Sequence, residues 1–233
     1  MRTKATLMAI LAIGTALSGQ VNAAEAIAVP GDYPTIQEAV DAASPGQEIE
    51  VAAGQWKGAE IWQPVKIKGE GSDTRIIDGV TLFDAGFAIY SEGTEISHMT
   101  IENTNFGVFV TFNTDNVSLN HIEFSGCAVC VYSEGDGLTV THSKFELREV
   151  NGPSYRVAEL SMVGSNGVFA HNELQISLSG FVRTTAAIGL FGFGLMVNNN
   201  VIEHNKISWS TRKVPSTLPA SMVAFDFSGA RQE

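Results

Sequence analysis

The sequence predicts an all-β fold in which short strands stack as the coils of a solenoid. Residues 90–96 (YSEGTEI) recur as residues 132–138 (YSEGDGL), and halving that 42-residue offset reaches a related segment at residues 111–117. The resulting 21-residue period is rich in β-branched residues, Gly and Asn. Only 17% of the residues are charged while 23 are Gly, a balance that favours strands and tight turns. A repeat of this length suits one coil, stacked about 4.8 Å from the next.

The beginning of the chain, residues 1–23, is expected to be a signal peptide. Arg2 and Lys4 precede an apolar run at residues 5–17, and the residues before position 24 suit cleavage after Ala23. No second hydrophobic segment suggests membrane insertion. We therefore expect residues 24–233 to form a single domain that is periplasmic or secreted.

The charge of the chain indicates which classes of binding partner to expect. The whole chain carries 25 acidic and 14 basic residues, a net charge of -11, and no Lys/Arg cluster interrupts that field. Binding of nucleic acid through its phosphates is therefore not expected. The sequence also contains no HExxH, GxSxG, P-loop or dinucleotide fingerprint.

A short helix is expected before the first coil, near residues 35–44. Thr35 and Glu38 form a capping box, Ile36 and Val40 lie on one helical face, and the Pro-Gly pair at residues 45–46 ends the segment. Such a helix would cover the apolar end of the solenoid. Residues 48–52 are then expected to form the first strand.

Alternation within each coil predicts which side chains face the core. In the repeated strand the inward set is Phe87, Ile89, Val108, Val110, Val129 and Val131, and the outward set is Ala88, Tyr90, Phe109, Thr111, Cys130 and Tyr132. A second strand aligns Ile96, Val117 and Leu138, and a third contains Ile101, Phe124 and Phe145. About six or seven coils of three strands are expected. Cys127 is predicted in the core and Cys130 as an exposed or half-covered thiol beyond disulfide reach.

Further motifs lie at the start of the predicted domain. They are residues 33–43 (YPTIQEAVDAA), 49–51 (IEV), 65–69 (VKIKG) and 76–79 (IIDG), with Gly46 and Gly54 between them. This region resembles the opening of pectinesterases and other pectin lyase-like proteins, well over residues 28–79 and more loosely to residue 209. The resemblance implies a right-handed parallel β-helix with an N-terminal capping α-helix, in a superfamily of secreted proteins that often cut, modify or hold polysaccharides. The catalytic signatures of pectinesterases are not recognisable, so Asp226 is given no catalytic role.

All five histidines precede an inward apolar residue by three positions, which places them on the outer surface or at a turn. One interpretation is a metal ladder and the other, which we favour, is a polar stack similar to the asparagine ladders of β-helices. The five are His98, His121, His142, His171 and His204.

The outward residues Tyr90, Phe109 and Tyr132 predict an aromatic strip along the long axis. Aromatic faces stack well against sugar rings, so a polysaccharide is the expected partner. The alternative is that the strip packs beneath the irregular segment at residues 147–158. Either way, a partly covered aromatic face beside a loop is the best candidate for a groove.

A row of carboxylates is expected at the turn that follows the strip. Asp115 and Asp136 could take part in a calcium site, because Ca²⁺ takes six to eight oxygen ligands. Glu92 and Glu134, predicted two coils or about 9.6 Å apart, alternatively approach the spacing of a hydrolase acid and base. The third alternative is a solvated acidic edge. Arg148, Arg156 and Arg183 lie in the two irregular insertions and are candidate bases for a polysaccharide lyase, and Arg156 is the one we select.

The function that these observations favour is the binding of a polysaccharide along one face of a secreted β-helix. The first hypothesis adds cleavage or modification by a lyase, hydrolase or epimerase, which agrees with the superfamily's habits. The second is a non-catalytic carbohydrate-binding, surface-assembly or interaction protein, which agrees with the short chain and the missing active-site motifs. Both remain open on the sequence.

Overall fold

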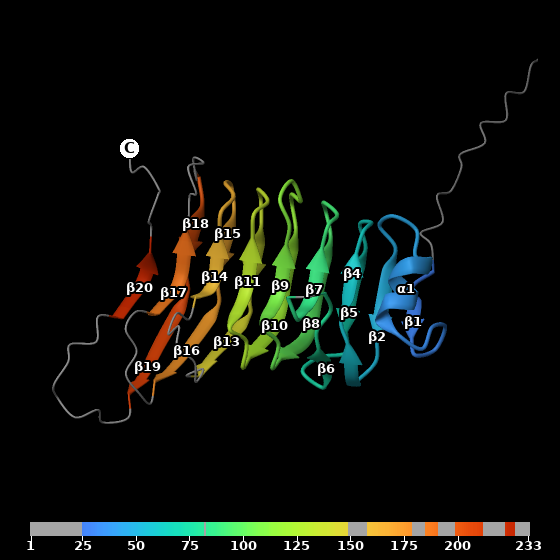
Figure 1. Ribbon diagram of the computed structural model, residues 1–233, viewed down its shortest axis with the longest axis horizontal. Helices are drawn as coiled ribbons and strands as arrows, with labels where there is room; N and C mark the ends of the chain where they lie inside the picture. Colours follow the sequence, from blue (N-terminus) through green and yellow to red (C-terminus); the bar gives the residue numbers. More distant parts are fainter. Residues whose placement is uncertain are drawn as a thin grey trace, which may run out of the picture.

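The computed structural model describes residues 25–81, 83–148, 158–178, 185–190, 199–211 and 222–226. The predicted all-β class is confirmed: the described elements are short strands and one helix (Figure 1). The strands of each sheet pair in parallel and follow one another along the long axis, with the helix at the N-terminal end. The expected signal peptide lies outside the described residues.

The helix, α1 (Ile36–Ala42), agrees with the prediction in position and in its N-terminal cap. The Thr35 hydroxyl accepts a hydrogen bond from the Glu38 amide, as a capping residue should. Ile36, Ala39 and Val40 are buried and join the main core, so the helix covers its N-terminal end. One strand, β1 (Ile27–Val29), precedes the helix and pairs with the strand that was expected to be first.

The strands form three rows, which we call A, B and C. Strands β8 and β10 are long enough to run through both A and B, and therefore these two rows make one 13-stranded sheet. Row A contains β1 (Ile27–Val29), β2 (Glu48–Val51), β5 (Lys66–Gly69), β8 (Glu95–Glu102), β10 (Ser118–Ser125), β12 (Thr139–Thr141), β15 (Val168–Ala170) and β18 (Val201–Glu203). Row B adds β3 (Gly54–Lys57), β6 (Thr74–Asp78), β13 (Lys144–Arg148), β16 (Glu173–Leu178) and β19 (Lys206–Thr211) to β8 and β10.

Row C is a separate 7-stranded sheet. Each of its strands pairs in parallel with the strand of the next repeat, which is why its outward side chains come to lie in columns. Its strands are β4 (Ala59–Ile61), β7 (Ala85–Ile89), β9 (Phe106–Val110), β11 (Val129–Ser133), β14 (Ala158–Met162), β17 (Thr185–Leu190) and β20 (Met222–Asp226).

One apolar core receives side chains from all three rows. Ile101, Phe124 and Phe145 are fully buried and aligned in successive repeats as predicted, with Phe124 and Phe145 stacked 4.8 Å apart between ring centroids. The predicted inward residues Phe87, Ile89, Val108, Val110 and Val131 are likewise buried in this cluster.

The constant 21-residue period is wrong, and the error has a local cause. Five residues separate β7 from β8 and five separate β11 from β12, but seven separate β9 from β10. As a result Val108 pairs with Val131, not with Val129, and Ile96 pairs with Leu119, not with Val117. An insertion of two residues leaves the inward and outward parity of a strand unchanged. This is why most of the burial predictions hold.

Two predicted orientations at the start of β11 are wrong. Val129 lies beside Phe106 and is only partly buried, whereas Cys130 is almost fully buried in the core. A Cβ atom at Gly107, the residue between Phe106 and Val108, would lie within 2.8 Å of the Phe124 ring, so this strand position points toward the interior. Cys127 is also in the core, as predicted, and a hydrogen bond from Cys130 lowers its pKa against the opposing effect of burial. The two side chains therefore do not point to opposite faces.

The five histidines lie where row A bends into row B, one in each of five successive repeats. Neighbouring imidazole rings stack with centroids 4.8 to 5.2 Å apart. Each of the five residues has a positive φ, from 51° to 58°. The predicted row on the outer surface is thus confirmed in position.

Candidate functional site

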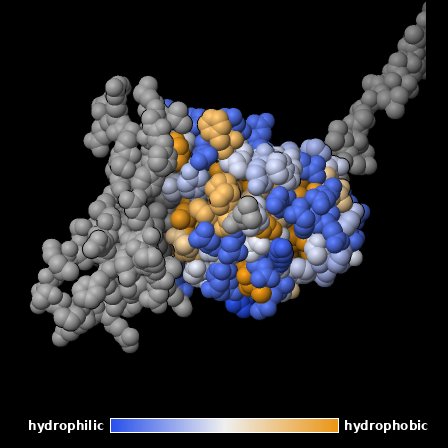
Figure 2. All heavy atoms as spheres, viewed as in Figure 1, coloured by the Kyte–Doolittle hydropathy of each residue, from blue (hydrophilic) through white to orange (hydrophobic). Residues whose placement is uncertain are grey.

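The outer side of row C carries six aromatic side chains that we call the aromatic surface: Trp62, Phe83, Tyr90, Phe106, Phe109 and Tyr132. Their neighbours there are small, since Val80, Ala85 and Ala88 form a separate apolar cluster against which Tyr90, Phe106 and Phe109 pack. In the view of Figure 2, apolar side chains interrupt an otherwise hydrophilic surface. The aromatic surface thus rests on its own small cluster and not on the main core.

Three of these rings form one continuous stack. Phe109 and Tyr132 are paired in register on β9 and β11, and their centroids lie 5.3 Å apart with planes only 6° from parallel. On the other side of Phe109, the Phe83 ring stacks at 5.3 Å. The residue in register with Phe109 on β7 is Ala88, whose small side chain leaves room for Phe83 to reach this position from its loop. The stack therefore spans three repeats although only two of its rings come from strands.

Tyr90 belongs to a second stack, with Trp62. Their ring centroids are 3.8 Å apart and their planes 2° from parallel. The predicted single column of Tyr90, Phe109 and Tyr132 is therefore wrong. The register of β7 and β9 pairs Ile89 with Val110, which places Tyr90 next to Thr111 and not next to Phe109.

The outermost members of the two stacks are the most accessible. Trp62 is 65% exposed and Phe83 is 52% exposed, whereas the other four rings are partly buried. Phe106 stands edge-on to Phe109 and Tyr132 and fixes them from the side. The segment that was expected as an alternative cover falls largely outside the described residues, at positions 149–157.

Both tyrosines of the aromatic surface have phenols that resist ionisation. Burial raises the pKa of Tyr132, and the hydrogen bond from its hydroxyl to Glu134 Oε1, 2.7 Å long, raises it further. Burial, followed by the charge of Glu60, raises the pKa of Tyr90. Both rings therefore stay neutral at physiological pH and can act as stacking platforms.

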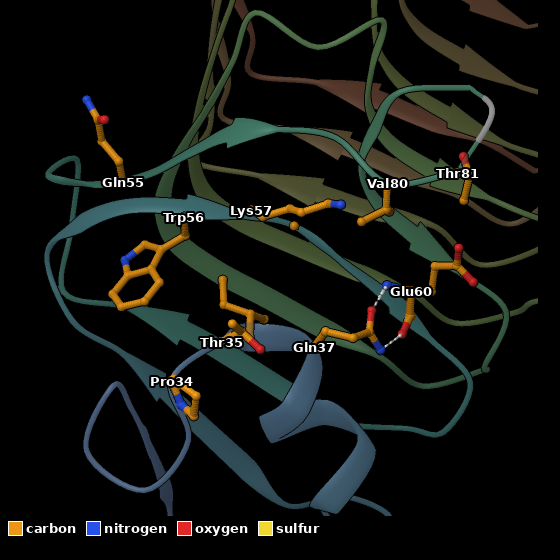
Figure 3. A pocket seen from close by; sticks show the side chains of 11 residues that line it. Pro34, Thr35, Gln37, Gln55, Trp56, Lys57, Glu60, Val80 and Thr81 are labelled. Carbon is orange, nitrogen blue, oxygen red and sulfur yellow. Dashed lines mark hydrogen bonds between the residues drawn. The ribbon is translucent and has the colours of Figure 1, made fainter.

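A cavity of about 540 Å³ adjoins the aromatic surface at the N-terminal end (Figure 3). It lies between the start of α1, strand β3 and the loop after β6, and is lined among others by Gln37, Trp56, Lys57, Glu60 and Val80. Val80 also belongs to the apolar cluster beneath the aromatic surface. The cavity thus lies next to the aromatic surface.

Two of the lining side chains are held by hydrogen bonds to the main chain. The Gln37 amide donates to the Glu60 carbonyl and accepts from the Glu60 amide (Figure 3). Trp56 Nε1 donates to the Ala52 carbonyl at 2.9 Å. By contrast, neither Lys57 nor Glu60 takes part in an ion pair with another described residue. The cavity therefore has a fixed wall and two charged groups of opposite sign.

The predicted acidic edge is used in part to join successive repeats. Asp115 Oδ1 accepts a hydrogen bond from the Asp136 amide, and Asp136 Oδ1 accepts one from the Ser165 amide. Each of these carboxylates retains a second oxygen. Among the residues that the structure describes, no group of three or more His, Cys, Asp or Glu side chains is arranged to hold a metal ion. Calcium at Asp115 and Asp136 stays a prediction.

Glu92 and Glu134, two of the three predicted catalytic residues, are not aligned with each other across the repeats. Glu134 follows Ser133, which pairs with Val110 and through it with Ile89, so Glu134 is aligned with Tyr90. Glu92 lies two positions further on and is exposed. Arg156 is outside the described residues.

Three residues of the aromatic surface, Trp62, Phe83 and Phe106, were not predicted from the sequence. Phe106 has the same parity as the inward Val108, so alternation would have placed it in the core. Trp62 follows β4, whose pairing of Ile61 with Ile89 would have placed it beside Tyr90 had the register of that short strand been known. Phe83 lies in a loop between repeats, where no periodic signal exists.

The chain was also compared with known proteins. No protein-family model, no curated protein and no solved structure matches it. Within the part of the chain that the structure describes, no helix has the length and apolar character needed to span a membrane.

Proposed function

We propose that the protein is a periplasmic or secreted right-handed parallel β-helix of the pectin lyase-like kind, and that its aromatic surface binds a polysaccharide. Three features support the fold: three rows of parallel strands, a single core that receives all three, and a helix over its N-terminal end. The resemblance of residues 28–79 to pectinesterases points the same way.

The observation that carries the function is the pair of ring stacks on a rigid sheet. Phe83, Phe109 and Tyr132 lie in one line with a ring at each 5.3 Å step. Trp62 and Tyr90 lie beside that line. Aromatic rings held in fixed positions contribute affinity because little side-chain freedom is lost when a ligand binds. Because the faces of stacked rings cover one another, a flexible chain of sugar rings running along row C would meet the edges of these rings in succession and the uncovered faces of the rings at the ends of the stacks.

Binding is proposed ahead of catalysis. Glu134 is hydrogen-bonded to Tyr132, and Asp115 and Asp136 hold main-chain amides, so all three have structural partners next to the aromatic surface. A lyase or hydrolase activity that uses Glu92, Glu134 or Arg156 is the second candidate. Its product, a new reducing end or an unsaturated sugar, would be detected in the same screen.

The test is a screen of neutral and acidic polysaccharides against wild type and a Trp62→Ala/Phe83→Ala variant. Both rings are more than half exposed, and their removal should leave the thermal midpoint unchanged. We expect binding to weaken by at least about tenfold, since each factor of ten corresponds to about 1.4 kcal/mol. Phe112→Ala is the matched control, because Phe112 is 60% exposed and stacks with no other described ring. Equal binding by the wild type and the double variant would refute the proposal.

A further inference from the structure

The cavity beside α1 lies at one end of the aromatic surface. We propose that it receives the terminal residue, a neutral hexose, of the polysaccharide chain whose following residues lie along the aromatic surface. This inference rests on the proposed function and adds to it that the protein recognises a chain end. Three properties of the cavity support this role: its position, the residues on its far side and its chemistry.

The position of the cavity continues the line of the ring stack. Glu60, on its wall, is paired in register with Ala88, and Ala88 is paired with Phe109, which is followed by Tyr132. A chain that lies on Tyr132 and Phe109 and passes Phe83 therefore reaches Glu60 after two further strands. The effect of the Glu60 charge on the Tyr90 phenol shows that these two groups are close.

Trp56 and Pro34 line the far side of the cavity. Figure 3 shows Val80 and Thr81 on one side, toward the next repeat, and Trp56 and Pro34 on the opposite side. The Trp56 ring is anchored through its indole nitrogen. A sugar chain entering past Val80 would therefore meet the anchored Trp56 ring and Pro34 in its path, and we infer that its last residue lies against them.

The chemistry of the cavity suits hydroxyl groups better than a charged sugar. Lys57 offers hydrogen-bond donors and the Glu60 carboxylate offers acceptors, and neighbouring sugar hydroxyls can serve both at once. Because the cavity holds one charge of each sign, a uronate or a cationic amino sugar would gain one attractive contact and suffer one repulsive contact, whereas the hydroxyls of a neutral hexose meet no repulsion. A volume of about 540 Å³ lies within the range of small-ligand sites, about 300–1,000 Å³.

The first test is the stoichiometry of binding, measured by isothermal titration calorimetry. The probes are size-fractionated glucan, mannan and galactan fragments, from the hexasaccharide to the long polymer. If the cavity takes a chain end, one protein binds each chain whatever its length. If the aromatic surface binds sugar anywhere along a chain, the number of proteins per chain rises with length, and that result would overturn the chain-end proposal while leaving the proposed function intact.

The second test uses Lys57→Met and Glu60→Gln, which keep the size of each side chain. Each is expected to weaken hexasaccharide binding by about tenfold without lowering the thermal midpoint. Lys68→Met and Glu50→Gln are the matched controls, because both residues line a different cavity of about 510 Å³ and should leave affinity unchanged. Wild-type affinity in Lys57→Met and Glu60→Gln, with affinity lost in Trp62→Ala/Phe83→Ala, would place the sugar on the rings alone. Failure of every neutral probe to bind wild type would overturn the chain-end proposal, and the proposed function falls with it only if the acidic polysaccharides of the first screen fail as well.

Discussion

Two rows of stacked rings run along this molecule, and they differ in how they arise. The histidine row repeats one residue type at one backbone position in five consecutive repeats, with spacings of 4.8 to 5.2 Å. The aromatic surface mixes Trp, Phe and Tyr, draws Phe83 from a loop, and spaces its ring contacts from 3.8 to 6.3 Å. The first row follows directly from the repeat, whereas the second departs from it.

This difference separates structure from function. A residue that recurs at one position in consecutive repeats solves a problem that those repeats share, which for the histidines is the bend from row A to row B at a positive φ. A residue that departs from the repeat does not meet a structural requirement shared by the repeats, so it is the better indication of a functional site. Ala88 in place of a larger side chain, the Phe83 loop and the cavity beside α1 are departures of this kind, and all three meet at one end of row C.

The largest effect is expected from a third stack, inside the core. Phe145 is fully buried between Phe124 and Phe169. Phe145→Ala should lower the free energy of unfolding by about 3–5 kcal/mol, because it removes buried apolar area and leaves a cavity. Urea denaturation would measure this. Trp62→Ala, which removes an exposed ring, is the control, and an equal loss in both variants would contradict the distinction between core and surface stacks.

The next largest effect concerns the backbone of the histidine row. His142 has a φ of 51°, which a β-branched residue adopts only under strain of about 1–3 kcal/mol. His142→Val should therefore destabilise the protein by about that amount. His142→Asn loses the same imidazole but tolerates this conformation, so it should cost less. If both substitutions cost the same in urea denaturation, ring stacking and not the bend explains the histidines.

A smaller effect is expected from the Tyr132 phenol, and it depends on pH. Its pKa in the folded protein is raised by burial and by Glu134, so the folded state holds the proton more tightly than the unfolded chain does. The stability from this group is present below the ordinary tyrosine pKa of about 10 and is lost as the pH rises above that value. Tyr132→Phe keeps the ring and removes the titration.

The measurement is urea denaturation of wild type and Tyr132→Phe between neutral and alkaline pH. Wild type should lose stability on passing about pH 10 more steeply than the variant does. Tyr90→Phe should show a change in the same direction, since the pKa of Tyr90 is also raised. Identical pH profiles in wild type and Tyr132→Phe would contradict the assignment.

Two kinds of feature could be predicted from the sequence: those set by neighbouring residues, such as a helix cap, and those set by the alternation of inward and outward side chains along a strand. The helix follows from its capping residue and its apolar spacing, and the alignment of Ile101, Phe124 and Phe145 was correct. The alignment between repeats was less predictable, because the two extra residues between β9 and β10 shift the register without changing parity. The burial of Cys130 could not be read from alternation, which is interrupted where β11 begins.

Only part of the candidate site was predicted from the sequence. Outward parity identified Tyr90, Phe109 and Tyr132 as surface aromatics, and all three belong to the aromatic surface. It could not identify Phe83 or the cavity, because both depend on how a loop and a helix pack against row C. Contacts of this kind are set by tertiary structure and leave no period in the sequence.

The smallest effect is expected for calcium binding at the acidic edge. Its carboxylates recur in some repeats and not in others, so this edge is intermediate between the regular histidine row and the irregular aromatic surface. In Asp115 and Asp136, one carboxylate oxygen accepts a hydrogen bond from a main-chain amide of the next repeat, and the other oxygen remains available. A calcium ion bound there would have few protein ligands, so affinity should be weak, and Ca²⁺ at a concentration equal to its Kd adds only about 0.4 kcal/mol of stability. In a domain of this size that raises the thermal midpoint by about 1 °C.

The variant Asp115→Asn/Asp136→Asn keeps both hydrogen-bond acceptors and removes both charges. It should therefore lose the calcium response, and without calcium it should melt near the wild-type temperature. Differential scanning calorimetry with Ca²⁺ and with Mg²⁺ as the control decides the matter: a rise that survives in the variant, or no rise in wild type, would leave the two aspartates with a structural role alone.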